Sequence, residues 1–161
     1  MTQPNRIVAL MLVALLTCVA QSSAQKSLLV LDASAAGGNY AAAITPVLDT
    51  NGDGVPELLI ADAYDDTAGT DAGRVQLRSG ADGTLLFTLT GDEANDLFGF
   101  DVSGVVDLDN DGKGDFIVGA PGLPGSSAKG YVRVFSGADG SEIFRFEGTE
   151  PGGQFGASVG G

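Results

Sequence analysis

Short apolar runs separated by polar, glycine-rich turns recur along most of the chain. The continuous runs at residues 58–61 and 116–119 predict strands covered on both faces. Residues 142–146 alternate polar and apolar side chains, which predicts a half-exposed outer strand. The strand predicted before it, residues 131–135, ends at a Gly-Ala-Asp-Gly turn whose residues tolerate the positive φ of a hairpin. The pattern therefore predicts an all-β fold, with a first strand of this unit at residues 98–106.

Self-comparison shows that these strands belong to a repeat of 57 to 58 residues. Each repeat predicts four strands, which is typical of a β-propeller blade. A propeller needs at least four blades, so two units predict an incomplete propeller or a fragment of one. The matching segments are 74–83 with 131–140, Phe98-Gly99 with Phe155-Gly156, and the acidic stretch 49–57 with 107–115.

The repeat and the pattern of the N-terminus together predict the boundaries of the chain's parts. In order, these are a signal peptide at 1–24, a residual outer strand of a preceding blade at 25–39, a first blade at 40–97, a second blade at 98–154, and the start of a further blade at 155–161. The first blade is degenerate, because Tyr40-Ala41 stands where the Phe-Gly pair is expected.

The N-terminus has the features of a secretory signal. Arg6 precedes an apolar run at residues 7–20 that is short for a membrane span, and small residues follow at 22–24. A buried N-terminal helix and lipidation of Cys18 are the alternatives. Cleavage near Gln25 would leave no cysteine, and no other segment predicts membrane insertion.

Two acidic loops are candidate metal-binding sites. In the loop 107–115, aspartates occupy positions 1, 3, 5 and 9, and Gly112 occupies position 6. Carboxylates at alternate positions of a tight loop can converge on one centre, where they repel unless a cation lies between them. Calcium takes about six to eight oxygen ligands, so the loop and its copy at 49–57 predict about two calcium ions per chain. Solvated turns are the alternative. An EF-hand is excluded, because position 12 is Ile60 or Val118 instead of Glu.

The composition of the chain disfavours two classes of function, nucleic-acid binding and histidine-based catalysis. The formal net charge of −13 disfavours nucleic acid as a partner, since that requires basic patches. The chain has no histidine, which excludes histidine-based acid–base catalysis and histidine triads. No catalytic constellation is found, and we expect no enzyme activity.

The second unit resembles the FG-GAP repeat of integrin α-subunit propellers. Phe98-Gly99, the acidic loop and Gly119-Ala120-Pro121 follow in that order. The first unit departs from the pattern, with Ala61-Asp62-Ala63 in place of Gly-Ala-Pro. The resemblance implies a calcium-binding propeller that acts outside the cell in recognition, adhesion or scaffolding, with an unidentified protein or glycan as partner.

The resemblance also implies the ligands. In the second loop they are Asp107, Asp109, Asp111 and Asp115, with the Lys113 backbone carbonyl. In the first loop they are Asp49, Asn51, Asp53 and Glu57, with the Val55 backbone carbonyl. Because Asn51 is uncharged, we expect the first site to bind calcium more weakly.

Two other interpretations remain. The chain could be the non-catalytic propeller part of a secreted lyase, hydrolase or phospholipase whose active site lies outside it. Alternatively, short copies could assemble with one another or with further blades, residues 28–31 of one copy completing a blade of the next.

Overall fold

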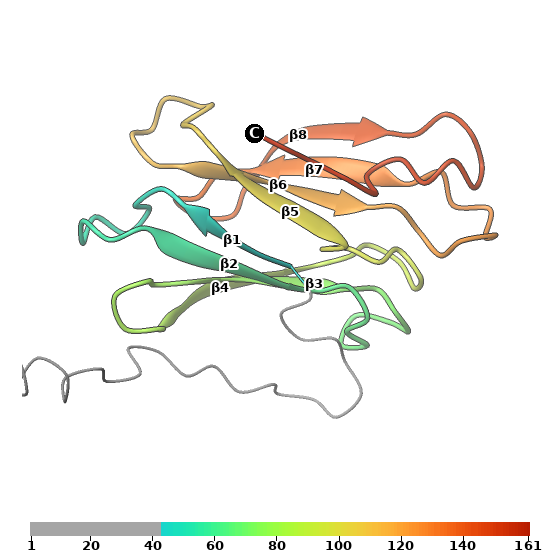
Figure 1. The fold of residues 1–161 in the computed structure, drawn as a ribbon, viewed down its shortest axis with the longest axis horizontal. Coiled ribbons are helices and arrows are strands. Elements are labelled where there is room, and N and C mark those ends of the chain that lie inside the picture. Colours follow the sequence, from blue (N-terminus) through green and yellow to red (C-terminus); the bar gives the residue numbers. More distant parts are fainter. Residues whose placement is uncertain (1–42) are drawn as a thin grey trace, which may run out of the picture. The chain divides into compact units, whose positions relative to one another are not determined.

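The structure is a computed structural model that describes residues 43–161. Two four-stranded antiparallel sheets make up its regular structure, each with its strands in chain order (Figure 1). The first sheet contains β1 (Ala43–Val47), β2 (Glu57–Asp62), β3 (Arg74–Arg78) and β4 (Leu85–Thr90). The second contains β5 (Asp101–Val105), β6 (Asp115–Ala120), β7 (Tyr131–Phe135) and β8 (Glu142–Glu147). The predicted all-β fold of blade-like sheets is confirmed, and the two sheets do not close a ring.

No helix in residues 43–161 is long and apolar enough to cross a membrane. The predictions for the signal peptide, Cys18, the strand at 25–39 and Tyr40-Ala41 concern residues outside this range. The predicted boundaries between blades stay predictions.

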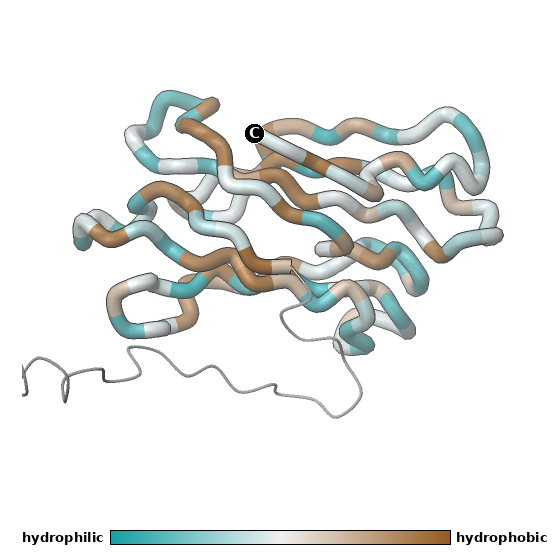
Figure 2. The backbone as a smooth tube through the Cα atoms, viewed as in Figure 1, coloured by the Kyte–Doolittle hydropathy of each residue, from teal (hydrophilic) through white to brown (hydrophobic). Residues whose placement is uncertain are grey.

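The two sheets are built alike, as the repeat predicts. The register of β1 on β2 pairs Ala43 with Ala61, and the register of β5 on β6 pairs the equivalent Asp101 with Gly119. Both sheets also have an irregularity at the same place in the third strand, after Leu77 and after Val134. Apolar positions lie along the strands and polar ones in the loops (Figure 2). The repeat in the sequence is therefore a repeat in the backbone.

The sequence predicted that the first strand of the second sheet begins at residue 98, but β5 begins at Asp101 and residues 98–100 lie outside it. Gly99 has φ +90°, which takes the chain out of the extended conformation. Phe98 instead bridges to Gly73 beside the first sheet, where its N–H donates to Ala72 O at 3.0 Å. The Phe-Gly pair thus anchors the start of the second unit on the first.

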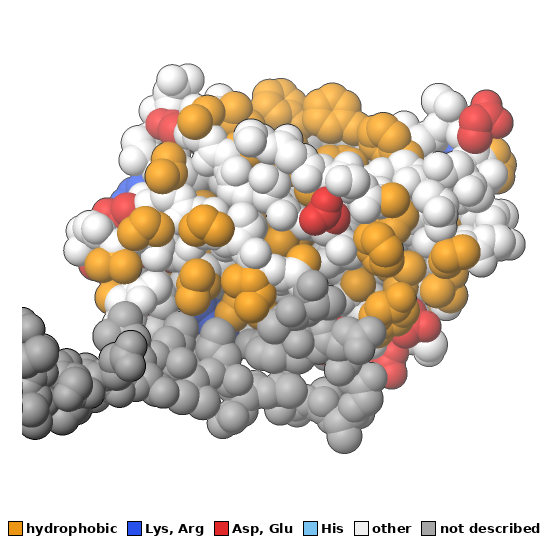
Figure 3. Space-filling view, in the orientation of Figure 1, with side chains coloured by type: hydrophobic (Ala, Val, Ile, Leu, Met, Phe, Trp, Pro, Cys, Tyr) orange, Lys and Arg blue, Asp and Glu red, His pale blue; other side chains and the backbone are white. Residues whose placement is uncertain are grey.

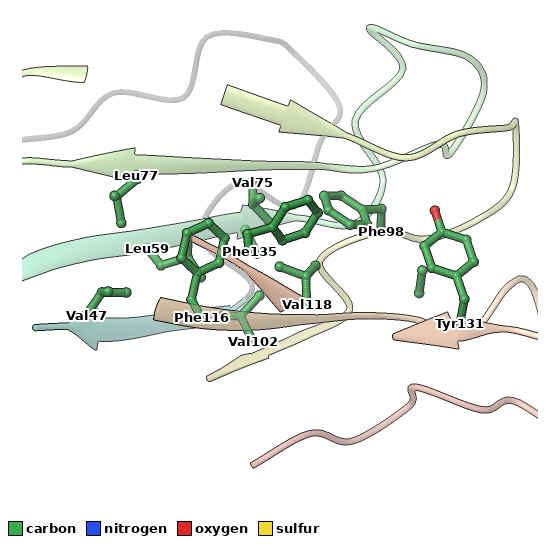
Figure 4. Close-up of a cluster of buried hydrophobic side chains, with 12 residues drawn as sticks. Val47, Leu59, Val75, Leu77, Phe98, Val102, Phe116, Val118, Tyr131 and Phe135 are labelled. Carbon is green, nitrogen blue, oxygen red and sulfur yellow. The ribbon is translucent and has the colours of Figure 1, made fainter. Parts of the chain in front are cut away.

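The core lies between the two sheets and contains the Phe98 side chain, which is fully buried (Figure 4). Its ring meets the ring of Phe135 edge-on, with the centroids 6.0 Å apart. Phe116 stacks on Phe135 at 5.5 Å. The first sheet contributes Val47, Leu59, Ala61, Val75 and Leu77 to this core, and the second Val102, Phe116, Val118, Ala120, Tyr131 and Phe135. Burial of such side chains stabilises by about 1.5–3 kcal/mol each.

Phe100, Phe144 and Phe146 are exposed, although their apolar side chains would suit a core between blades. Phe144 and Phe146 of β8 pair with Val134 and Val132 of β7. Side chains alternate along β7, and its Tyr131 and Phe135 lie in the core, so these pairs are on the face of the second sheet that points away from the first. Apolar side chains gather along the edge of the molecule that β8 occupies (Figure 3). The alternation of polar and apolar side chains in β8 was predicted correctly, but among residues 43–161 no other sheet covers the outer face of the second sheet.

The two sheets approach each other closely at a glycine of β5. A Cβ atom on Gly104 of β5 would lie 2.1 Å from the Pro46 carbonyl oxygen of β1. Backbone atoms cannot yield at such a distance without moving the strands apart. Gly104 therefore sets the spacing of the inner strands β1 and β5.

We predict that Gly104→Ala lowers the free energy of unfolding by about 1–3 kcal/mol, because the added methyl group forces β1 and β5 apart. Urea denaturation measures this change. Gly160→Ala is the control, since a Cβ atom there would meet nothing within 4 Å. Equal stability of the two variants would contradict the close approach.

Candidate metal centre

Two acidic loops connect the first two strands of each sheet, residues 49–57 and 107–115. The first aspartate of each loop organises the turn by accepting backbone hydrogen bonds. Asp49 accepts from Gly52 N–H at 2.7 Å and from Gly54 N–H at 2.9 Å. In the second loop Asp107 accepts from Asn110 at 2.6 Å and from Gly112 at 2.8 Å. The glycine at position 6 has φ +83° in the first loop and +87° in the second, so the chain curls around the position-1 carboxylate.

The last acidic residue of each loop is also the first residue of a buried strand. Glu57 and Asp115 are fully buried. One carboxylate oxygen of each accepts a backbone N–H of position 2 at 2.6 Å, from Thr50 and from Leu108 respectively. This hydrogen bond closes the loop, and it places a buried carboxylate beneath the exposed ones.

Each loop brings three carboxylates together, with one oxygen of each within 4.8 Å of the others. In the first loop these are Asp49, Asp53 and Glu57; in the second they are Asp107, Asp109 and Asp115. Carboxylates at this spacing repel one another, and a cation among them removes the repulsion. The predicted residues thus form clusters that could hold a metal ion.

The remaining predicted ligands lie in the loops but outside these triplets. Asn51 Oδ1 accepts from Asp53 N–H at 2.8 Å, and Asp111 Oδ1 accepts from Lys113 N–H at 2.8 Å. Val55 N–H donates to Asp53 Oδ1 at 2.8 Å. These contacts shape the turns, and the ligand roles of these residues stay predictions.

The buried carboxylates are not equally satisfied. Both oxygens of Asp115 accept backbone hydrogen bonds, the second of them from Gly137 N–H at 3.1 Å. Glu57 Oε1 is buried and accepts no hydrogen bond from any described residue. A buried, unpaired carboxylate oxygen costs several kcal/mol unless a positive partner reaches it. The chemistry of this donor set, three carboxylates with one free buried oxygen, fits a hard cation.

Local electrostatics differ between the loops. Burial raises the pKa of the Asp115 carboxyl above its ordinary value, and the nearby charges of Asp109 and Asp111 act in the same direction, against two backbone hydrogen bonds. The pKa of Asp49 is lowered, mainly by hydrogen bonds from Gly54 and Gly52. In the second loop, burial and neighbouring negative charge thus disfavour the ionised form of Asp115, and a cation nearby would favour that form.

Sequence reasoning missed the turn after the third strand as part of the site. Ser79 Oγ donates to Asp53 at 3.4 Å, and Ser136 Oγ donates to Asp111 at 3.3 Å. The following Gly137 supplies the N–H to Asp115. The signal was present in the sequence, because Ser-Gly-Ala-Asp-Gly is identical in both units.

The fold and the loops together define the class: an all-β protein built of propeller-type blades, each with an acidic loop between its first two strands. Residues 98–135 match the family model of the FG-GAP repeat. This segment runs from Phe98 through the acidic loop to the end of β7. The chain therefore contains an FG-GAP repeat, as its motifs indicated, and the first sheet has the same strand order and loop placement.

A second polar cluster lies at the opposite end of the second sheet, around a cavity of about 300 Å³. Tyr131 O–H donates to Asp96 at 2.8 Å, and the Arg145 guanidinium lies 4.5 Å above the Tyr131 ring. Asp92 pairs with Arg145 at 2.6 Å and with Arg133 at 3.1 Å. Because these groups are paired with each other, the cluster ties the turn after β4 to β7 and β8.

Burial and the hydrogen bond to Asp96 raise the pKa of Tyr131 far above that of a free tyrosine. Its neutral form is thus favoured in the folded state, and this contribution to stability is complete below about pH 10, the pKa in the unfolded chain, and is lost as the pH rises above it. We predict that tyrosinate absorbance attributable to Tyr131 emerges only as the chain unfolds in alkali.

The difference between the absorbance titrations of the unchanged chain and of Tyr131→Phe isolates this signal. Far-UV circular dichroism follows unfolding in parallel. A difference signal that titrates near pH 10 while the sheets remain folded would contradict the prediction. The same variant loses the hydrogen bond to Asp96, and we expect a cost of about 1 kcal/mol at neutral pH.

Proposed function

We propose that this chain is a secreted, calcium-binding module of propeller blades that serves in extracellular recognition, adhesion or scaffolding and is not itself an enzyme. The observation that supports calcium most directly is Glu57 Oε1, a buried carboxylate oxygen without a hydrogen bond beside Asp49 and Asp53. The predicted signal peptide and the resemblance to integrin α propellers support the extracellular role. The absence of histidine from the chain supports the non-catalytic role.

In this proposal calcium has a structural task. Bound calcium supplies positive charge that neutralises the carboxylates of each loop. The first site would be held by the side chains of Asp49, Asn51, Asp53 and Glu57 with the Val55 carbonyl. The second would be held by Asp107, Asp109, Asp111 and Asp115 with the Lys113 carbonyl. Since Glu57 and Asp115 begin β2 and β6, each ion would tie its loop to a central strand.

We predict that calorimetric titration of EDTA-treated chain with calcium gives two ions per chain. The midpoint of thermal unfolding should rise, and each ion should add about 2.7 kcal/mol of stability at a calcium concentration one hundred times the Kd of its own site. Glu57→Gln should remove only the first ion, and Asp115→Asn only the second. Glu93→Gln, an exposed acid outside the loops, is the control.

The two single-site variants also measure the affinities separately. We expect the site remaining in Asp115→Asn to be the weaker, because Asn51 lacks the charge that Asp109 supplies. Two ions in every variant would contradict the ligand assignment, and equal affinities would contradict the role of Asn51.

We also propose that another blade of the same build covers the outer face of the second sheet. The repeat supplies the reason. On the first sheet, Phe87 and Leu89 pack on the core that the second sheet covers. Their counterparts 57 residues later, Phe144 and Phe146, are 49% and 52% exposed. Phe155, the counterpart of the fully buried Phe98, is 43% exposed. The outer face thus has the apolar side chains of a blade interface.

With no further blade present in solution, this face should bind other copies of the chain. We predict a light-scattering mass above that of one chain, which falls towards the monomer in Phe146→Ser. Leu85→Ser, which removes an exposed leucine from the first sheet, is the control and should not change the mass. A monomer for the unchanged chain would contradict assembly through copies.

A further inference from the structure

The two acidic loops lie against each other. A Cβ atom on Gly114 of the second loop would lie 2.5 Å from Leu48 Cβ, directly before the first loop. A Cβ atom on Gly137, in the turn that hydrogen-bonds Asp115, would lie 2.7 Å from Thr50 Cγ2 of the first loop. Both contacts join a loop or its turn to the neighbouring unit, so the two acidic loops lie close together.

One charged side chain crosses from the second loop to the first. Lys113 Nζ lies 3.7 Å from the point where a Cβ atom on Gly52 would stand. Gly52 donates its N–H to Asp49, the position-1 carboxylate of the first loop. The Lys113 charge is among the causes that lower the pKa of Asp49. A cation from one loop therefore stands at the rim of the other loop's carboxylate cluster.

We propose that Lys113 couples the two sites: its ammonium group lowers the calcium affinity of the first loop, while its backbone carbonyl belongs to the second. This inference rests on the proposed calcium function, and it names a second residue, besides Asn51, that weakens calcium binding in the first loop. A positive charge at the rim of a carboxylate cluster repels a divalent ion and partly neutralises the carboxylates that attract it.

The repeat shows that this charge is particular to the second loop. Position 7 of the first loop is Val55, so the first unit has no equivalent ammonium group. The loop turn does not require lysine, because the contact that shapes it is made by the backbone N–H of position 7 in both loops, Val55 to Asp53 and Lys113 to Asp111. The side chain of Lys113 is therefore free to act on the neighbouring site.

The test replaces the charge and keeps the backbone. In Lys113→Met we expect calcium to bind the first loop about two- to fivefold more tightly in 0.1 M salt, where charges about 10 Å apart still interact. The second loop should change less. Lys113→Arg retains the charge and should keep the affinity of the unchanged chain. In about 1 M salt the difference between Lys113→Met and the unchanged chain should vanish.

Site-resolved readout comes from amide NMR of the full chain during calcium titration. The amides of Gly52 and Gly54 report on the first loop, and that of Gly112 reports on the second. Lys129→Met is the matched control. It removes the same charge from the connection between β6 and β7, at the end of β6 opposite the acidic loops.

The outcomes separate the inference from the proposed function. If no amide of the unchanged chain responds to calcium, both the calcium function and the coupling are wrong. If both loops bind calcium and Lys113→Met alters the first loop no more than Lys129→Met does, the calcium function stands and the coupling is wrong. A selective, salt-dependent gain in the first loop supports the coupling.

Discussion

The structure depends on the close face-to-face packing of two sheets whose inner strands meet through glycine. Gly104 lies against the Pro46 carbonyl, and Gly114 lies against Leu48. Phe98 fills the space between the sheets near the third strands. Since the inner strands β1 and β5 end at the acidic loops, their spacing also determines how near the two loops lie. The packing of the core therefore also determines the arrangement of the candidate metal centre.

The acidic loops are shaped by local hydrogen bonds and by contacts with segments far away in the chain. Locally, the position-1 aspartate accepts N–H groups from the turn that follows it, and this curls each loop whatever lies nearby. The position-9 carboxylate is different, because it lies inside the sheet and is reached by backbone groups from other segments, such as Gly137 N–H on Asp115. A buried acid of this kind is a cost to the fold unless it has partners. Calcium as the missing partner of Glu57 is the proposal that makes the two loops consistent.

Much of the architecture could be predicted because the repeat reveals it twice. The bounds of β7 were predicted as observed, whereas β6 extends one residue further at each end and β8 one residue further at its C-terminal end. The failures have physical causes. Residues 98–100 look like strand, but Gly99 has a positive φ and Phe98 binds beside the preceding sheet. Phe144 and Phe146 follow strand periodicity correctly, yet periodicity does not say whether a second sheet lies on a given face.

The sequence by itself determined the fold class, the repeat, the spacing of the carboxylates and the family resemblance, because these depend on local patterns and on comparison of one half of the chain with the other. Only the tertiary structure decided which atoms meet. It placed Ser79 and Ser136 beside the loops, left Glu57 Oε1 unpaired, and brought Lys113 to the rim of the first loop. Those contacts join segments far apart in the chain, and their existence depends on how two sheets pack, which no local pattern specifies.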